Sequence, residues 1–258
     1  EDARRPPLRR VTIGEASDYL ALRRTAAPKM ALATMLCIFS PIALIGLAAV
    51  SELSASAFPL REGVAAGIGL CALLILVAIA VVLFMDCGNK AKEYEFLEKE
   101  PFETEYGVTG MVKERQKAFK PTYDHMNTIG TVLCVLSFVP LFAVMAVIQD
   151  GFFMTMAVCL LLAVVGIGVY FFVYGGTIYS SMEKLLEEGD YTRREKSQKN
   201  ITGPVSVIYW LVATAIFMIY TFGPKGNGQP RYSWIIWAVA GVLYAAVLAG
   251  IKLIRNRK

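Results

Sequence analysis

The side chains that could act as acids, bases, nucleophiles or metal ligands are few in this chain and stand apart. The one histidine, His125, lies at the inner mouth of the third span, and no base or nucleophile pair embedded among apolar residues accompanies it. The five cysteines form no Cys-x-x-Cys pair and no cluster with histidine, so the spacing of a zinc site is missing. The glycine-rich stretch at 223–228 lacks the spacing of a phosphate-binding loop. These residues predict no enzyme activity, no metal site and no cofactor.

Apolar runs dominate the remainder of the sequence. Hydrophobic residues make up 56% of the chain and charged residues 18%, whereas a soluble domain carries about 45–50% and about 25%. A membrane span needs roughly 20 apolar residues, and a charge at its centre costs about 2.5–3.5 kcal/mol. The sequence therefore predicts an all-α integral membrane protein whose partner is the lipid bilayer. Its six transmembrane helices are the runs without Asp, Glu, Lys, Arg or His at 30–50, 64–85, 126–148, 152–174, 205–222 and 234–251.

The positions of lysine and arginine predict how these spans are oriented. Of the 26 Lys and Arg residues, only Arg61, Lys225 and Arg231 lie in the connections on one side, and the other 23 lie on the opposite side. Loops rich in Lys and Arg stay in the cytoplasm. We therefore expect a multi-pass protein of the cell membrane with both termini in the cytoplasm. Because the chain begins with Glu1 and not Met, we expect it to be a fragment or a processed product.

The first two spans resemble the next two. Residues 34–40 (TMLCIFS) and 131–137 (TVLCVLS) share four of seven positions, and residues 70–84 and 158–172 share seven of fifteen. Because each copy has two spans, both copies enter the membrane in the same direction, which predicts a tandem parallel repeat. The predicted parts are a cytoplasmic linker helix at 1–29, a first repeat at 30–125, a second at 126–204, and a C-terminal two-span hairpin with a basic tail at 205–258.

A serine and a proline stand at corresponding places in the first and third spans. Proline removes a backbone donor and kinks a helix, and a nearby serine can supply a partner for the freed carbonyl. One interpretation is a pair of kinked helices that line a cavity for an apolar or lipid-like ligand. The other is ordinary transmembrane proline that serves only packing, and a homodimer is a further open possibility. The candidate cavity or kink residues are Cys37, Ser40, Pro41, Cys134, Ser137 and Pro140.

Local signals outside the spans predict short helices. Thr12 and Glu15 have the spacing of a capping box, which predicts a helix to about Arg24. Its apolar stripe is formed by Ile13, Ala16 and Leu20. The connection at 86–125 is predicted to hold two helices that break near Pro101 and Gly107–Gly110, with Pro121 ending the second. We expect these segments to be too small to form independent domains.

Small residues at helical spacing predict close contacts between spans, because they let two backbones approach each other. They occur in the second, fourth and sixth spans, as Gly63 and Gly67, Gly166 and Gly168, and Gly241, Ala245 and Ala249.

Strings spread over nearly the whole chain resemble the membrane-embedded C-terminal half of a bacterial helix-turn-helix regulator family, the Xre type. They are LCIFSP at 36–41, LEKEPFETEYGVTGMVKERQKAF at 97–119, LLEEGDY at 185–191, IYWLVATAIF at 208–217 and SWIIWAVAGVLYAAV at 233–247. Residues 11–24 resemble the linker helix of that family. The resemblance implies a cytoplasmic DNA-binding domain before Glu1, so that DNA would be a partner only through a domain that this chain lacks.

Two functions remain open at this point. The first is the sensor or anchor module of a membrane-tethered transcription regulator. The second is a transporter-like or accessory membrane subunit with no role in DNA binding. Spans without ionisable residues favour neither an enzyme nor an ion-coupled transporter, because such proteins usually keep charged groups within the membrane.

Overall fold

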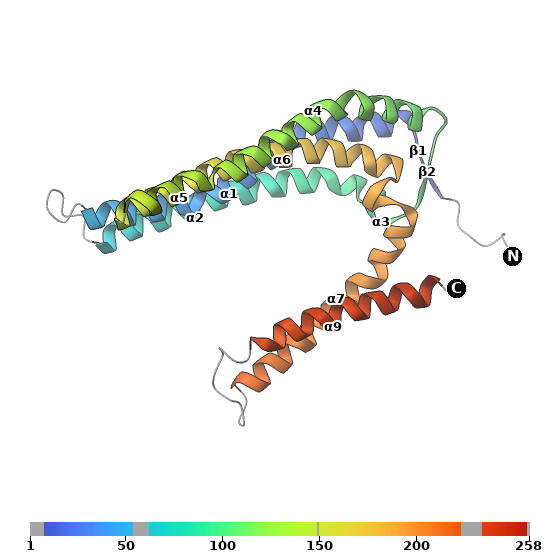
Figure 1. The fold of residues 1–258 in the computed structure, drawn as a ribbon. Helices are drawn as coiled ribbons and strands as arrows, with labels where there is room; N and C mark the ends of the chain where they lie inside the picture. Colours follow the sequence, from blue (N-terminus) through green and yellow to red (C-terminus); the bar gives the residue numbers. More distant parts are fainter. Residues whose placement is uncertain (1–7, 54–61, 149, 223–233, 257–258) are drawn as a thin grey trace. The chain divides into compact units, whose positions relative to one another are not determined.

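The structure is a computed structural model that describes residues 8–53, 62–148, 150–222 and 234–256, almost all of them helical (Figure 1). The chain divides into two compact units, Glu1–Tyr191 and Thr192–Lys258. The glycine-rich stretch at 223–228 and the loop residues Arg61, Lys225 and Arg231 lie outside the described residues.

Long helices running side by side form the first unit (Figure 1). They are α1 (Ile13–Leu53), α2 (Glu62–Ala91), α4 (Val108–Leu136), its continuation α5 (Phe138–Val147), and α6 (Gly151–Leu186). The helix α1 packs against α2 and α6, and α6 also packs against α4 and α5. Because α1 lies between α2 and α6, and α6 contacts α1, α4 and α5, these two helices form the middle of the unit.

Five of the described helices are long and apolar enough to cross a membrane. These stretches are Ile13–Ser51, Gly63–Tyr94, Val108–Val147, Gly151–Leu186 and Val205–Phe222. They contain the first five predicted spans. Large apolar side chains on them are exposed, such as Ile75 at 60% and Val135 at 64%, which suits contact with lipid. The sixth predicted span falls in α9, where the described apolar stretch, Ile235–Gly250, is shorter.

One end of the first unit holds its best-buried large side chains, including Phe102, Leu97 and Leu185. We name this group the basal cluster. It joins side chains from the polar ends of α1, α4 and α6 with the short segment between α2 and α4. Its members are Val11, Ala16, Tyr19, Leu20, Ala27, Leu97, Phe102, Val108, Val112, Ile178, Met182 and Leu185. The short segments outside the spans, predicted to be too small for independent domains, thus bury their apolar side chains against one another.

The all-α fold class is confirmed, and two short strands that the sequence did not predict complete the basal cluster. Strand β1 (Arg9–Val11) pairs in parallel with β2 (Phe102–Thr104), with Arg9 opposite Phe102 and Val11 opposite Thr104. Before β2 come a short 3₁₀ turn, η3 (Lys92–Tyr94), and the helix α3 (Phe96–Lys99). Three-residue strands are too short to show the alternation by which sequence patterns indicate a strand.

The helix that begins at the predicted capping box is much longer than expected. The box is confirmed: the Thr12 N–H donates to Glu15 Oε2 at 3.1 Å, and the Glu15 N–H donates to Thr12 Oγ1 at 3.2 Å. Of the predicted stripe, Ala16 and Leu20 are buried but Ile13 is 44% exposed. The helix does not end at Arg24, because α1 runs on to Leu53.

One prediction about proline was wrong: Pro121 lies inside α4, which it was predicted to end. Pro28 and Pro41 lie inside α1, which is continuous from Ile13 to Leu53. A proline costs a helix one hydrogen bond and some crowding. Packing of α1 on α2 and α6, and of α4 on α6, outweighs that cost.

The glycine predictions were right in α6 only. A Cβ on Gly166 would overlap the Phe39 ring of α1, and a Cβ on Gly168 would lie 3.0 Å from the Gly130 carbonyl oxygen of α4. A Cβ on Gly63, Gly67 or Gly241 would meet nothing within 4 Å. The α1–α2 contact instead depends on a glycine that the motif missed, Gly69, which lies against Leu44. Ala245 and Ala249 are exposed.

The second unit is a hairpin of α7 (Arg193–Phe222) and α9 (Ile235–Asn256) that follows the 3₁₀ turn η4 (Gly189–Tyr191). Aromatic rings join the two helices. The ring centroids of Trp210 and Trp237, which stack, are 5.9 Å apart, and those of Tyr209 and Tyr244 are 5.3 Å apart. The Tyr209 hydroxyl donates to the Ala240 carbonyl at 2.5 Å, and Ser206 and Tyr244 share a hydrogen bond. The unit begins at Thr192, and α7 begins at Arg193, well ahead of the apolar stretch that starts at Val205.

The basal cluster should be a main source of stability for the first unit. We expect Phe102→Ala to lower the free energy of unfolding by about 3–5 kcal/mol, the usual cost of removing a buried aromatic ring. The measurement is denaturant unfolding of the purified chain in detergent micelles. Tyr106→Ala is the matched control, since Tyr106 is 98% exposed and surface changes usually stay within about 0.5 kcal/mol. Equal losses for the two variants would contradict a packed cluster.

Candidate functional site

At the first predicted kink the helix is continuous, and a serine hydroxyl replaces the backbone hydrogen bond that the proline removes. In a regular helix the N–H of residue 41 would donate to the Cys37 carbonyl, and Pro41 has no N–H. The Ser40 hydroxyl donates to that same carbonyl at 2.8 Å, and Ser40 is buried. The serine therefore satisfies the acceptor that the proline leaves free, as the sequence predicted.

At the second predicted kink, α4 ends at Leu136 and α5 begins at Phe138. Ser137 lies between them with helical backbone angles (φ −59°, ψ −25°), three residues before Pro140. The Ser137 hydroxyl donates to the Cys134 carbonyl at 2.7 Å, the same pairing as Ser40 with Cys37. The carbonyl that Pro140 leaves free belongs to Leu136, so this serine does not repair it.

Close helix contacts surround these candidate residues. The ring of Phe39 packs on Gly166, and the thiol sulfur of Cys134 would lie 2.9 Å from a Cβ on Gly168. Cys159 Sγ lies 4.0 Å from the Ile42 carbonyl oxygen of α1. The structure thus brings the first repeat against the second here through α1 and α6. A ligand cavity at this level stays a prediction.

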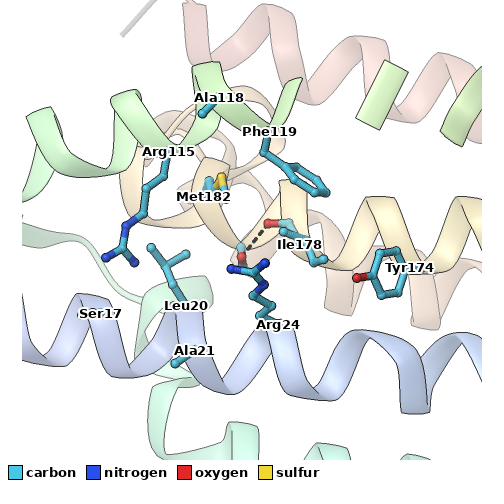
Figure 2. A pocket seen from close by; sticks show the side chains of 11 residues that line it. Ser17, Leu20, Ala21, Arg24, Arg115, Ala118, Phe119, Tyr174, Ile178 and Met182 are labelled. Carbon is cyan, nitrogen blue, oxygen red and sulfur yellow. Dashed lines mark hydrogen bonds between the residues drawn. The ribbon is translucent and has the colours of Figure 1, made fainter. Parts of the chain in front are cut away.

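A cavity that the sequence did not predict lies at the polar end of the same helices, beside the basal cluster. It measures about 670 Å³ and opens between α1, α4 and α6 (Figure 2). Such a volume is typical of small-molecule sites. We name it the arginine-lined cavity. Its lining residues are Ser17, Leu20, Ala21, Arg24, Arg115, Ala118, Phe119, Tyr174, Ile178, Ser181 and Met182.

The floor of the arginine-lined cavity is apolar and firmly held. Leu20, Ile178 and Met182 are buried members of the basal cluster. Ser181 is 1% exposed, and its hydroxyl donates to the Ile178 carbonyl at 2.6 Å, drawn as the dashed line in Figure 2. The floor therefore offers a fixed apolar surface, and its one hydroxyl donor is already used within α6.

Cationic side chains stand over this floor. Arg24 extends from α1 and Arg115 from α4 toward the space between the helices (Figure 2). Both are exposed residues, and among the described residues no carboxylate lies within 4.0 Å of either guanidinium group. Two nearby lysines do find partners: Lys29 Nζ lies 3.2 Å from Asp86 Oδ2, and Lys113 Nζ lies 3.9 Å from Glu188 Oε1. The cavity thus combines two uncompensated guanidinium groups with an apolar floor.

Residue spacing in the sequence indicates which positions of each helix share a face, but not that the three faces enclose a cavity. Within each helix the lining positions follow the three- and four-residue spacing of one helix face. They are 17, 20, 21 and 24 in α1, 115, 118 and 119 in α4, and 174, 178, 181 and 182 in α6. Nothing in the sequence tells which three faces meet, since they come from segments up to 165 positions apart in the chain.

The titratable residues considered at the start remain scattered. His125 is exposed on α4, and the cysteines are all free thiols. Among the described residues no three His, Cys, Asp or Glu side chains come together as a metal site would require. A smaller cavity of about 170 Å³ lies around Arg23 and Tyr94, where the buried Arg23 Nε has no hydrogen-bond partner.

Comparisons with known proteins add no assignment. No protein-family model, no curated protein and no solved structure matches the chain.

The Ser40–Pro41 pair can be tested by a double-mutant cycle. Ser40→Ala should lower the free energy of unfolding by about 1–3 kcal/mol, because the Cys37 carbonyl loses its donor in an apolar setting. In a Pro41→Ala background the new N–H satisfies that carbonyl, so Ser40→Ala should then cost much less. Unfolding in detergent micelles measures all four proteins.

The control for this cycle is Ser51→Ala, since the Ser51 hydroxyl also donates to a carbonyl three residues back, at 2.7 Å, but no proline follows it. A Ser40→Ala cost that is the same in the wild-type protein and in the Pro41→Ala background would disprove the repair.

Proposed function

We propose that this chain is the membrane-embedded sensor module of a membrane-tethered helix-turn-helix transcription regulator. It would have six transmembrane spans and both termini in the cytoplasm. The observation that carries the proposal is the continuity of α1 from the capping box into the apolar stretch. Support also comes from the resemblance of residues 11–24, 97–119 and 185–191 to the membrane half of Xre-type regulators, since lipid does not dictate the composition of those segments.

A continuous α1 is suited to passing a change in packing from the membrane side to the N-terminal side. Its 41 residues measure about 60 Å at 1.5 Å per residue, twice the roughly 30 Å of a hydrocarbon core. The part outside the apolar stretch is docked, because Ala16, Tyr19 and Leu20 are buried in the basal cluster and β1 is paired with β2. A domain attached before β1 would follow any movement of this body.

The arginine-lined cavity is placed where a ligand could cause such a movement. Its walls come from α1, α4 and α6, the helices whose polar ends form the basal cluster. A ligand shifts an equilibrium only if it binds one arrangement better than another. A bound molecule that draws Arg24 and Arg115 together would favour the arrangement with α1 close to α4.

Six spans and a tandem repeat are parts of the same proposal. The excess of Lys and Arg on one side supports placing the basal cluster in the cytoplasm. Helix α9 would form the sixth span together with residues beyond Gly250, since it continues to Asn256. The matching bonds of Ser40 to Cys37 and of Ser137 to Cys134 support the repeat. The two hairpins should then superpose by a rotation about the membrane normal.

The test uses the complete gene product in cells of its source. DNA that co-purifies with the tagged full-length protein should be enriched at discrete sites. Val112→Thr, which places a hydroxyl in the basal cluster, should change the output of a reporter driven from those sites at least severalfold. Protein levels in the membrane fraction must be matched.

The control is Tyr106→Ser, because Tyr106 lies in the same region but is almost fully exposed. No enriched DNA would reject the regulator and favour an accessory membrane subunit. If DNA is enriched but the reporter output does not change in Val112→Thr, the spans only tether the regulator to the membrane and do not sense.

A further inference from the structure

We propose that the arginine-lined cavity binds the headgroup of an anionic phospholipid, with the phosphate between Arg24 and Arg115. This inference rests on the proposed function in one respect, the placement of the basal cluster at the cytoplasmic face of the membrane. Charge, polarity and position each support it.

The charge argument is that the cavity has cations without anions. Guanidinium groups are suited to phosphate because their donors form a fork that matches two phosphate oxygens. Several other cations of the unit do pair with carboxylates, as Arg9 does with Glu15 at 3.5 Å and Lys90 with Asp86 at 3.0 Å. Arg24 and Arg115 face each other's helices across an open space instead. Two like charges at one cavity favour a ligand that carries negative charge.

The polarity argument is that a small inorganic anion would not use the remaining lining. Leu20, Ile178 and Met182 form an apolar floor, and Phe119 and Tyr174 stand at one end of the cavity (Figure 2). A ligand that suits both parts has an anionic group and an apolar chain. A phospholipid has both, and its glycerol region can lie between them.

The position argument comes from α6. The predicted span 152–174 ends at Tyr174, and Met182 lies eight residues further on, about 12 Å along the helix. The headgroup layer extends roughly 5–8 Å beyond the hydrocarbon core. The aromatic end of the cavity would therefore meet the edge of the acyl chains. Arg24 lies six residues, about 9 Å, before the predicted span 30–50, and Arg115 lies eleven residues, about 16 Å, before the span 126–148. Arg24 would then lie at the edge of the headgroup layer and Arg115 on its cytoplasmic side. Basic pockets between helices on the cytoplasmic side are known to hold such headgroups.

Binding there would act on the same helices as the proposed sensing. One phosphate held by Arg24 of α1 and Arg115 of α4 would join two helices that otherwise meet mainly through α6. The amount of anionic lipid in the inner leaflet would thus set how firmly α1 is held.

The test is native mass spectrometry of the purified chain, titrated with phosphatidylglycerol and with phosphatidylcholine of the same acyl chains. We expect the first bound lipid to be held roughly 30-fold more tightly for phosphatidylglycerol, if each arginine contributes as a basic residue near an anionic surface does. Arg24→Gln with Arg115→Gln should remove that preference. Lys117→Gln, an exposed cation of α4 outside the cavity, should keep it within about twofold.

Glycerophosphoglycerol separates a lipid from a soluble phosphate ester, since it is the phosphodiester headgroup of phosphatidylglycerol without acyl chains. It should compete only at far higher concentration than the lipid, and competition at equal concentration would overturn the lipid in favour of a soluble ester. Equal affinity for the two lipids, or the same loss in Lys117→Gln as in the arginine variant, would overturn the site. A phosphatidylglycerol carrying a photoreactive acyl chain should label Phe119 or Tyr174, and labelling only elsewhere would also overturn it. None of these readouts uses DNA, so a negative result for the lipid site can be distinguished from a failure of the proposed regulator function.

Discussion

The first unit depends on a single constraint: α1 must be one helix in two environments. Its C-terminal half is apolar and its N-terminal half is docked in the basal cluster. Alanine allows close packing in the N-terminal half of α1, because Ala16, Ala27, Ala31 and Ala33 are all 0% exposed. Small side chains let neighbouring backbones approach. Larger residues at these positions would push α2 and α6 away from α1.

Different forces hold the two halves together. At the basal end, burying Phe102, Leu97 and Leu185 removes apolar surface from water, which is worth about 25 cal/mol per Å². Between spans in lipid that driving force is absent, and close packing must replace it. The contacts of Gly166 with Phe39, Gly168 with Gly130, and Gly69 with Leu44 supply that packing. The arginine-lined cavity lies beside the basal cluster, where packing between α1, α4 and α6 opens.

How much of this could be predicted depends on whether a feature is local. The apolar runs, the capping box at Thr12 and the close contacts at Gly166 and Gly168 follow from composition and spacing within one helix. The course of α4 through Pro121 could not be predicted, because packing on α6 outweighs the local cost of proline. The pairing of β1 with β2 and the lining of one cavity by Arg24 and Arg115 bring together segments about 90 positions apart. No local pattern encodes such pairs.

The central claim is that the helices of the first unit leave the membrane together on the cytoplasmic side, where they form the basal cluster. Reporter fusions that are active only in the cytoplasm or only outside it test this claim most directly. The account predicts cytoplasmic signals for fusions after Lys90, Lys196 and Lys258, and external signals after Ala57 and Lys225. A cytoplasmic signal after Ala57 would contradict it, because α1 would then not cross the membrane.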